Sequence, residues 1–388
     1  MPVWFAFFLL SAATHAVVGY LAIRPRRVCP PDAHWTQKAR LGWPFRQFGA
    51  VGPSAGAAMV MVVMRDHLAD WWSVTILAWS VLMGSTVGLI LATRGVKVLE
   101  NRVVDWMLTL ATSWIALNPT VILAYPVLAL GLTRPWDPMT WAFGGVLILF
   151  SSGTLNPVTL GLGRRLGLVC PVTEPVVGMV RELSEELGMR PPKVLSIRVA
   201  AANAFALPKH RMILVTPMVE RLLEPDLMKA ILAHEMGHLA ETETHGSIRI
   251  LRASSPVVIL LAIPLAGLLD WPLLPAATVV LYLVMLRRFH AWSSARETDA
   301  DSFAGGTTGG PLKFARALER IHELGETPAV MGRKESTHPE LVQRLAELGY
   351  TPEWSAPDPP SRARTMICTV SALLILVAVA VWWQVPTF

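Results

Sequence analysis

A chain of 388 residues in which 53% are hydrophobic and 16% are charged is too apolar for an ordinary soluble protein, since soluble domains carry about 25% charged residues. The net charge of +6 is compatible with nucleic-acid binding, but the arginines flank apolar segments, so we expect cytoplasmic loops and no nucleic-acid partner. Three scattered cysteines without a C-x-x-C pair favour neither a disulfide framework nor a cysteine-ligated zinc.

Apolar stretches predict eight membrane spans, because a spanning helix needs roughly 20 apolar residues. Six are predicted to cross singly. Of these, the second is the shortest, and the fourth contains prolines that would kink it. The remaining pair is joined only by Asp270 and is either a tilted hairpin or a re-entrant pair. The predicted spans are 4–23, 48–64, 71–92, 106–132, 139–162, the pair 256–269 and 271–286, and 366–383.

The loop charges predict the orientation of the spans, because cytoplasmic loops are enriched in arginine and lysine. No basic residue precedes the first span and three arginines follow it, which is typical of an uncleaved anchor with its N-terminus outside. The basic loops 24–46 and 94–102 are then cytoplasmic, and the loops 65–70 and 134–138 lie outside. With eight spans, the polar region after Arg164 faces the cytoplasm and both termini lie outside.

The polar segment 164–252 has the pattern of a small α+β domain. Residues 174–187 have helical periodicity and end at Gly188, a typical helix terminator. Residues 193–199 and 212–215 alternate as strands do, with Asn203-Ala204-Phe205-Ala206 between them. A short helix is expected over 218–223.

Residues 234–238, HEMGH, form an H-E-x-x-H motif inside the helix-permissive stretch 227–240. On a helix, residues four apart share one face, so His234 and His238 can reach one Zn²⁺ with Glu235 beside them as a general base. Gly237 lies between the histidines and leaves room for another segment to pack closely. Without further ligands, the motif would be only a helix with two histidines.

Zinc in a catalytic site needs a third protein ligand and an open position for water. Glu241 is one turn beyond His238 and stays a candidate, although the metzincin pattern fails because glycine is needed where Glu241 stands. Glu297 is the better candidate, since a ligand from a separate segment surrounds the ion more completely. Asp301, one turn further on, is placed to accept the second ring N–H of a ligand histidine.

Four motifs in this order resemble the membrane-embedded zinc metallopeptidases that include the CaaX prenyl protease and the bacterial heat-shock protease HtpX. The resemblance covers about residues 174–348. The motifs are 203–206, 234–238, 296–301, and 336–339 followed by Arg344. The five predicted spans before the core are more than the simplest bacterial members would be expected to have.

The resemblance implies one zinc ion per chain, bound by His234, His238 and Glu297. It implies that Glu235 is the general base and that Asp301 supports a ligand histidine.

It also implies that His338 and Arg344 stabilise the oxyanion, a role for preorganised donors. Asn203, Ala204 and Phe205 would border the cleft, where an extended substrate can add as a strand. Without the resemblance, these three residues would be read as a turn between two strands.

The predicted fold is mainly α: a polytopic α-helical membrane protein with a cytoplasm-facing, zincin-like (gluzincin) α+β catalytic core. We expect a multi-pass protein of the inner (plasma) membrane, and the excess of arginine over lysine is typical of a GC-rich bacterial genome. The predicted parts are an N-terminal membrane region (1–163), a zincin part (164–254), a hairpin (255–287), a second cytoplasmic part (288–364) and a C-terminal span (365–388).

The predicted function is a zinc-dependent endopeptidase that hydrolyses peptide bonds of membrane or cytoplasmic polypeptides at the bilayer surface. The first alternative is a signalling protease whose N-terminal spans sense a signal or bind a membrane-protein partner. The second is a non-proteolytic scaffold or transporter that retains a zinc fold, although such a protein has no need of the base Glu235.

Overall fold

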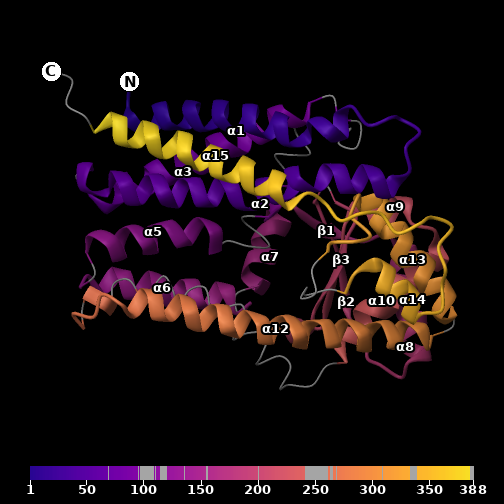
Figure 1. Ribbon diagram of the computed structural model, residues 1–388. Coiled ribbons are helices and arrows are strands. Elements are labelled where there is room, and N and C mark those ends of the chain that lie inside the picture. Colours follow the sequence, from indigo (N-terminus) through magenta and orange to yellow (C-terminus); the bar gives the residue numbers. More distant parts are fainter. Residues whose placement is uncertain are drawn as a thin grey trace.

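A computed structural model describes residues 1–68, 70–94, 96, 109, 111–113, 120–134, 136–153, 156–199, 201–240, 261–262, 265–267, 269–307, 309–332 and 339–384. Its long apolar helices lie side by side, and a small sheet with shorter helices lies beyond one end of them (Figure 1). The beginning of α1 and the end of α15 lie at the opposite end, away from the sheet (Figure 1).

The best-packed helices of the membrane part are α1 (Val3–Arg27), α2 (Trp35–Met64), α3 (Trp71–Thr93) and α15 (Arg362–Trp383). A short turn of 3-10 helix, Arg65–His67, joins α2 to α3. The shorter helices α5 (Thr120–Thr133) and α6 (Pro138–Ser151) pack against each other beside this group.

Glycines allow α1 and α3 to approach closely. A Cβ atom built on Gly84 would lie 2.2 Å from the backbone oxygen of Phe8, and one on Gly88 would lie 2.2 Å from that of Ala12. Lipid gives apolar helices no hydrophobic reason to associate, so close packing through small residues is a main source of their stability.

The described residues contain five helices long and apolar enough to cross a membrane, or six if one bent pair counts as a span. Predicted spans 4–23, 71–92 and 366–383 are matched by α1, α3 and α15. Most of 256–269 and the first part of 106–132 lie outside the described residues. The predicted count of eight therefore stays a prediction.

The predicted span 139–162 is not a single straight helix, although its two helices together still pass as one broken span by length and composition. The chain forms α6 and then α7 (Asn156–Arg165), which are bent by 81° relative to each other. Gly153 adopts a φ of +71°, which is left-handed, and Pro157 has no N–H with which to continue a helix. The stretch is apolar, as predicted, but these two residues separate it into two helices.

The second span is longer than the predicted 48–64, because α2 begins at Trp35 within the predicted loop. Residues 35–47 are too polar for a membrane span but not for a helix. Their buried side, including Ala39 and Phe45, faces protein, and Trp35 packs against the core of the sheet domain.

The four-stranded sheet has the order β1-β2-β4-β3. β2 is parallel to β4, whereas β1 and β3 pair antiparallel with β2 and β4. The strands are β1 (Val169–Pro171), β2 (Lys193–Ile197), β3 (Ala204–Leu207) and β4 (Met212–Val215). The predicted strands 193–199 and 212–215 are confirmed, and 203–206 mostly forms an edge strand rather than a turn.

Helices surround this sheet and supply the core of the domain. The predicted helix 174–187 and its stop at Gly188, which has a φ of +61°, are confirmed. The helices are α8 (Glu174–Glu186), the 3-10 turn Pro208–His210, α9 (Pro217–Leu222), α10 (Pro225–Leu239), α13 (Gly310–Gly325) and α14 (Leu341–Glu347).

One helix links the two parts. α12 (Leu274–Gly305) has an apolar first half, largely exposed on the surface of the protein, and a second half that packs on α10 and α13. It runs from the membrane part to the sheet domain (Figure 1). The segment that was expected to follow a span is therefore a continuation of the same helix.

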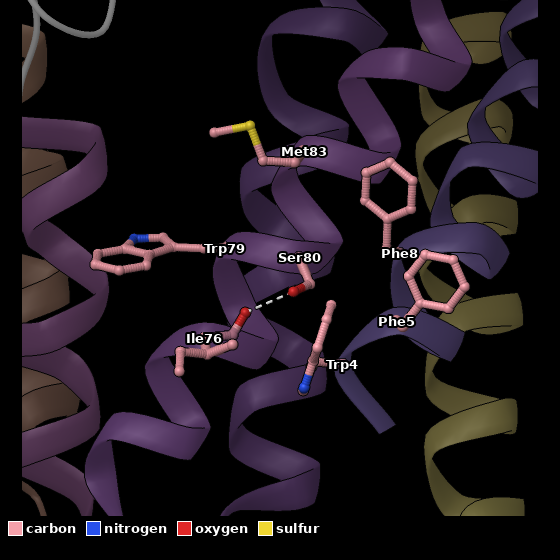
Figure 2. Close-up of a pocket in the computed structure, with 7 residues that line it drawn as sticks. All are labelled: Trp4, Phe5, Phe8, Ile76, Trp79, Ser80 and Met83. Atoms are coloured by element: carbon pink, nitrogen blue, oxygen red, sulfur yellow. Dashed lines mark hydrogen bonds between the residues drawn. The ribbon is translucent and has the colours of Figure 1, made fainter. Parts of the chain in front are cut away.

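A pocket of about 560 Å³ lies between α1 and α3 (Figure 2). Its one hydroxyl group, on Ser80, already donates to the backbone oxygen of Ile76. The pocket is therefore an apolar surface without catalytic groups. Its lining residues are Trp4, Phe5, Phe8, Ile76, Trp79, Ser80 and Met83.

Replacing Gly88 by leucine should destabilise the membrane part, because the new side chain has no room beside the Ala12 carbonyl. Overpacking of this kind costs about 1–3 kcal/mol or more. Thermal unfolding of the purified protein in detergent measures the effect. Gly145→Leu in α6 is the control, since a Cβ there meets nothing within 4 Å; equal melting temperatures for both variants would contradict the packing argument.

Candidate active site

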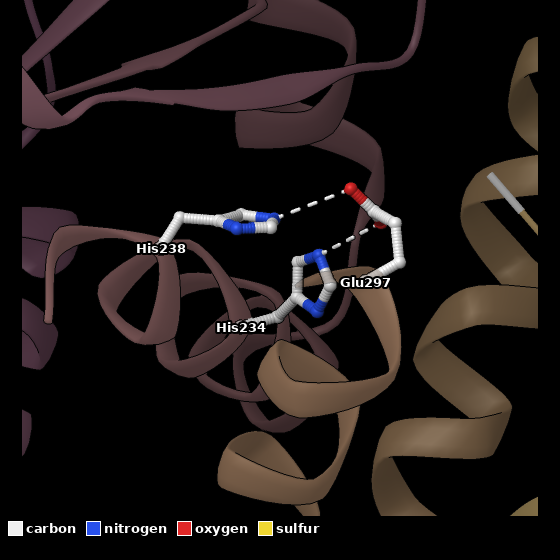
Figure 3. A group of neighbouring side chains, drawn as sticks. All are labelled: His234, His238 and Glu297. Carbon is white, nitrogen blue, oxygen red and sulfur yellow. Dashed lines mark ion pairs between the residues drawn. The ribbon is translucent and has the colours of Figure 1, made fainter. Parts of the chain in front are cut away.

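The side chains of α10 and α12 converge at one point. His234 and His238 project from α10, and Glu297 projects toward them from α12 (Figure 3). His238 Nε2 lies 3.5 Å from Glu297 Oε1, and His234 Nε2 lies 3.6 Å from Glu297 Oε2. One donor atom from each residue lies within 4.8 Å of the other two.

The spacing of these donors fits a zinc ion. Two ligand atoms of a tetrahedral zinc, each about 2.1 Å from the metal, are about 3.4 Å apart, close to the two nitrogen–oxygen distances. The two imidazole rings are nearly perpendicular, at 85°, so both Nε2 atoms point toward the same carboxylate. Two histidines and one glutamate also leave a fourth position open, as a catalytic zinc requires.

His234 is held on two further sides. Its Nδ1 lies 3.0 Å from Asp301 Oδ1, the position from which a carboxylate orients a ligand histidine. The ring of Phe314, on α13, stacks on the imidazole with 5.4 Å between centroids. His234 is 6% exposed, so close packing as well as the nearby Asp301 carboxylate holds its ring.

Arg344, on α14, binds Asp301 from the other side with two parallel hydrogen bonds. Its Nε donates to Oδ2 at 2.7 Å and its Nη2 to Oδ1 at 2.6 Å. Burial alone would lower the pKa of Arg344, but the hydrogen bonds and charge of Asp301, with the charges of Glu297 and Glu235, raise it above its ordinary value. The guanidinium is therefore firmly cationic behind the metal ligands.

Glu235 is 6% exposed and belongs to this cluster. Its carboxylate is near enough to Arg344 to contribute to the raised pKa of the guanidinium. Burying a carboxylate costs free energy unless it is paired, and the role of general base would account for keeping Glu235 at this position.

Gly237 packs as the sequence predicted. A Cβ atom on this residue would lie 3.2 Å from the Cα atom of Ala300 and from a ring carbon of Phe303. The glycine therefore lets α12 approach α10 closely enough for Glu297 to face the histidines.

The structure places some predicted residues at the edge of the site and leaves two undescribed. Asn203 precedes β3, and Ala204 and Phe205 lie on it, at an edge of the sheet that packs beside α10. His338 and the alternative ligand Glu241 fall outside the described residues, so their roles stay predictions.

Two contacts were not predicted from the sequence. Phe314 reads as one apolar residue of an amphipathic helix, and nothing in its spacing indicates that it covers a histidine. The pairing of Arg344 with Asp301 joins residues 43 positions apart, and a lone arginine on a short helix gives no indication of such a partner.

Comparison with known proteins matches residues 173–351 to Peptidase family M48. A protein of Thermococcus sibiricus called "Protease HtpX homolog" is 26% identical over 210 residues, which cover 48% of this chain and 70% of that protein. Another of the same name, from Acidiphilium cryptum, is 33% identical over 165 residues, or 38% of this chain and 56% of its own. A third protein of this name, from Aeropyrum pernix, is 27% identical over 268 residues, which cover 63% of this chain and 75% of that protein.

The matched segment contains both helices that carry the donors, together with Asp301 and Arg344. Membrane helices, a small mixed sheet and a His-His-Glu group accompany it in this chain. Residues 173–351 thus match peptidase family M48, and the match, the relatives and the His-His-Glu group together support an HtpX-like membrane zinc metallopeptidase.

Proposed function

We propose that this protein is an integral membrane endopeptidase that cuts membrane or cytoplasmic polypeptides close to the bilayer surface. The observation that carries the proposal is the convergence of His234, His238 and Glu297 beside the buried Glu235. The three donors would hold one zinc ion per chain. Zinc supplies a nucleophile at neutral pH, because it lowers the pKa of a bound water to about 7, and it polarises the scissile carbonyl.

Glu235 would act as general base and then as general acid. It takes a proton from the attacking water and passes it to the leaving amine, so that peptide hydrolysis balances without another proton source. Asp301, whose Oδ1 lies 3.0 Å from Nδ1 of His234, would accept the Nδ1–H and so keep the ring in one tautomer and orientation. Arg344 fixes Asp301 in turn.

Oxyanion stabilisation by His338 and Arg344 is retained as part of the proposal. The two hydrogen bonds of Arg344 to Asp301 give this residue a second task, that of a positioning residue. Its nearest approach to a zinc ligand is 3.9 Å, from Nη2 to Glu297 Oε2.

An extended substrate would bind along β3. This strand is at the edge of the sheet, and an edge strand offers unpaired backbone groups to a peptide. It packs beside α10, which carries the histidines, so a peptide added there would pass close to them. Asn203, Ala204 and Phe205 would then contact the substrate.

The proposed orientation has the sheet domain in the cytoplasm. The basic loop 24–46 is at the same end of the bundle as this domain, since Arg26 and Arg46 contact Glu326 and Gly325. Gln384, near the end of α15, donates to the backbone oxygen of Val63 at the other end. These contacts support the relative sides predicted from the loop charges, and an inner-membrane location remains part of the proposal.

Metal content tests the assignment of the three donors. Purified protein should contain about one zinc per chain, and His234→Ala or Glu297→Ala should lose most of it. Asp301→Asn should bind zinc roughly 10–100-fold more weakly, the usual cost of removing a residue that orients a ligand. Metal analysis with a chelator titration measures both. Full zinc content in Glu297→Ala, with loss in Glu241→Ala, would assign the third ligand to Glu241 instead.

Replacing Glu235 by glutamine should separate metal binding from chemistry. The neutral amide cannot take the proton of the water, so cleavage of a casein substrate should fall by about 10²–10⁴-fold while zinc content and melting temperature stay near the native values. Undiminished turnover in this variant would rule out Glu235 as the base. Loss of zinc would instead give the residue a structural role.

The orientation can be tested with single cysteines at Asp137 and Lys193, in a background that lacks the three native cysteines. An impermeant reagent applied to intact cells should label position 137 and spare position 193, because the charge pattern puts the first outside and the second in the cytoplasm. The reverse pattern would put the zinc site on the outer face. Permeabilised cells, in which both positions should react, are the control.

A further inference from the structure

The C-terminal end of α13 is bound by two arginines from the membrane helices. Arg26 of α1 forms two hydrogen bonds with the Glu326 carboxylate, from Nη2 to Oε1 at 2.7 Å and from Nε to Oε2 at 3.2 Å. Both side chains are 13% exposed. Arg46 of α2 donates from Nη1 to the backbone oxygen of Gly325. We call Arg26, Arg46 and Glu326 the charge clamp.

The backbone of Glu326 indicates that its side chain is used. This residue follows α13 and is left-handed, with φ 42° and ψ 45°. Glycine is the usual residue at such a helix end, because a side chain disfavours this conformation. The chain has glutamate here instead, and its carboxylate receives both hydrogen bonds of the Arg26 fork. Arg46 adds a cation at the helix C-terminus, where the last carbonyl groups lack partners within the helix.

The other end of α13 touches the zinc-binding group. Phe314 is fully buried and stacks on the His234 ring. Its neighbours Ala315, Ala317 and Leu318 are buried in the same core, between α10 and α12. A helix rises 1.5 Å per residue, so about 18 Å of α13 separates Phe314 from Glu326. A rigid element of this length transmits a tilt at one end to the other.

We propose that the charge clamp lets the N-terminal membrane helices position α13, and through Phe314 the His234 ring, for metal binding and catalysis. Arg26, Arg46 and Glu326 are positioning residues, because none of them contacts the metal ligands. This inference rests on the proposed function, since it assumes that His234 binds zinc. It assigns to α1 and α2 a task in the enzyme beyond anchoring it in the bilayer.

A second ion pair between these parts of the described chain does not involve α13, and it provides a matched control. Arg40 of α2 pairs with Asp358, but the two side chains are 36% and 79% exposed, and exposed pairs contribute little. On α13 itself, Arg320 pairs with Glu323 one turn away, and both are 40% exposed. Neutralising Arg40 or Arg320 removes a similar charge but leaves the hydrogen bonds of the charge clamp intact.

The test uses the full chain, loaded with zinc in detergent or in bilayer discs. Arg26→Gln, Glu326→Gln and the double variant are compared with Arg40→Gln and Arg320→Gln. For each, the rate of zinc loss to a chelator, kcat and KM for a fluorescent casein, and the melting temperature are measured. Each single clamp variant should lose zinc roughly tenfold faster, within the range of couplings measured for residues in one network, and kcat should fall with KM little changed.

The double variant should lose zinc no faster than either single one, because each substitution alone already breaks the pair. Arg26→Lys keeps the charge but loses the two-pronged hydrogen bonding of the guanidinium, so its rate of zinc loss should lie between those of the native chain and Arg26→Gln. It also serves as the folded variant if Arg26→Gln does not fold. Zinc loss within about twofold of native in the clamp variants would overturn the inference. Lower melting temperatures with native zinc-loss rates, or equal effects in Arg40→Gln, would also overturn it.

The native chain separates this inference from the proposed function. If it neither retains zinc nor cuts casein, the proposed function itself fails. If it does both and the clamp variants behave as the native chain does, only the clamp is wrong.

Discussion

The close packing of α10 on α12 at Gly237 is the constraint on which the rest of the site depends. Two histidines on one helix face define only one side of a metal, and the third ligand must come from a helix that approaches to contact distance. A side chain at position 237 would press on Ala300 and Phe303, which lie on the same helix as Glu297 and Asp301. The glycine thus permits the present spacing of the two helices, on which the donor distances depend.

This packing also connects the membrane to the chemistry. α12 is 32 residues long, so at 1.5 Å per residue it spans about 48 Å, more than the roughly 30 Å thickness of a hydrocarbon core. Its apolar half is exposed as a lipid-facing helix would be, and its polar half carries Glu297 and Asp301. A single helix would therefore set the height of the site relative to the bilayer, in keeping with the proposal of substrates near the membrane surface.

Local patterns in the sequence were sufficient to predict the elements whose ends are marked by specific residues. Pro225 begins α10 and Gly188 ends α8, and Met212–Val215 alternates as a buried strand. Prediction failed where tertiary contacts decide the outcome. The polar first half of α2 is helical because protein covers one side of it, and β3 is a strand because β4 pairs with it. Composition alone did not locate the bend at Gly153.

The convergence of His234, His238 and Glu297 was predictable because motif spacing and chemistry constrain these residues, whereas the contacts of the groups around them were only partly predictable. Asp301 was predicted from its position one turn after Glu297, but the partner that satisfies it was not. An ionised carboxylate at 4% exposure is costly unless paired, and the His234 ring supplies one N–H at most.

Arg344 completes the pairing with the fork geometry that a carboxylate matches best. Its charge is thereby fixed in place before any substrate arrives. Any stabilisation that it gives to an oxyanion must be exerted from this position, with Asp301 still bound. The geometry therefore makes Arg344 the residue that orients Asp301, and any effect of its charge on a reacting carbonyl would depend on that orientation.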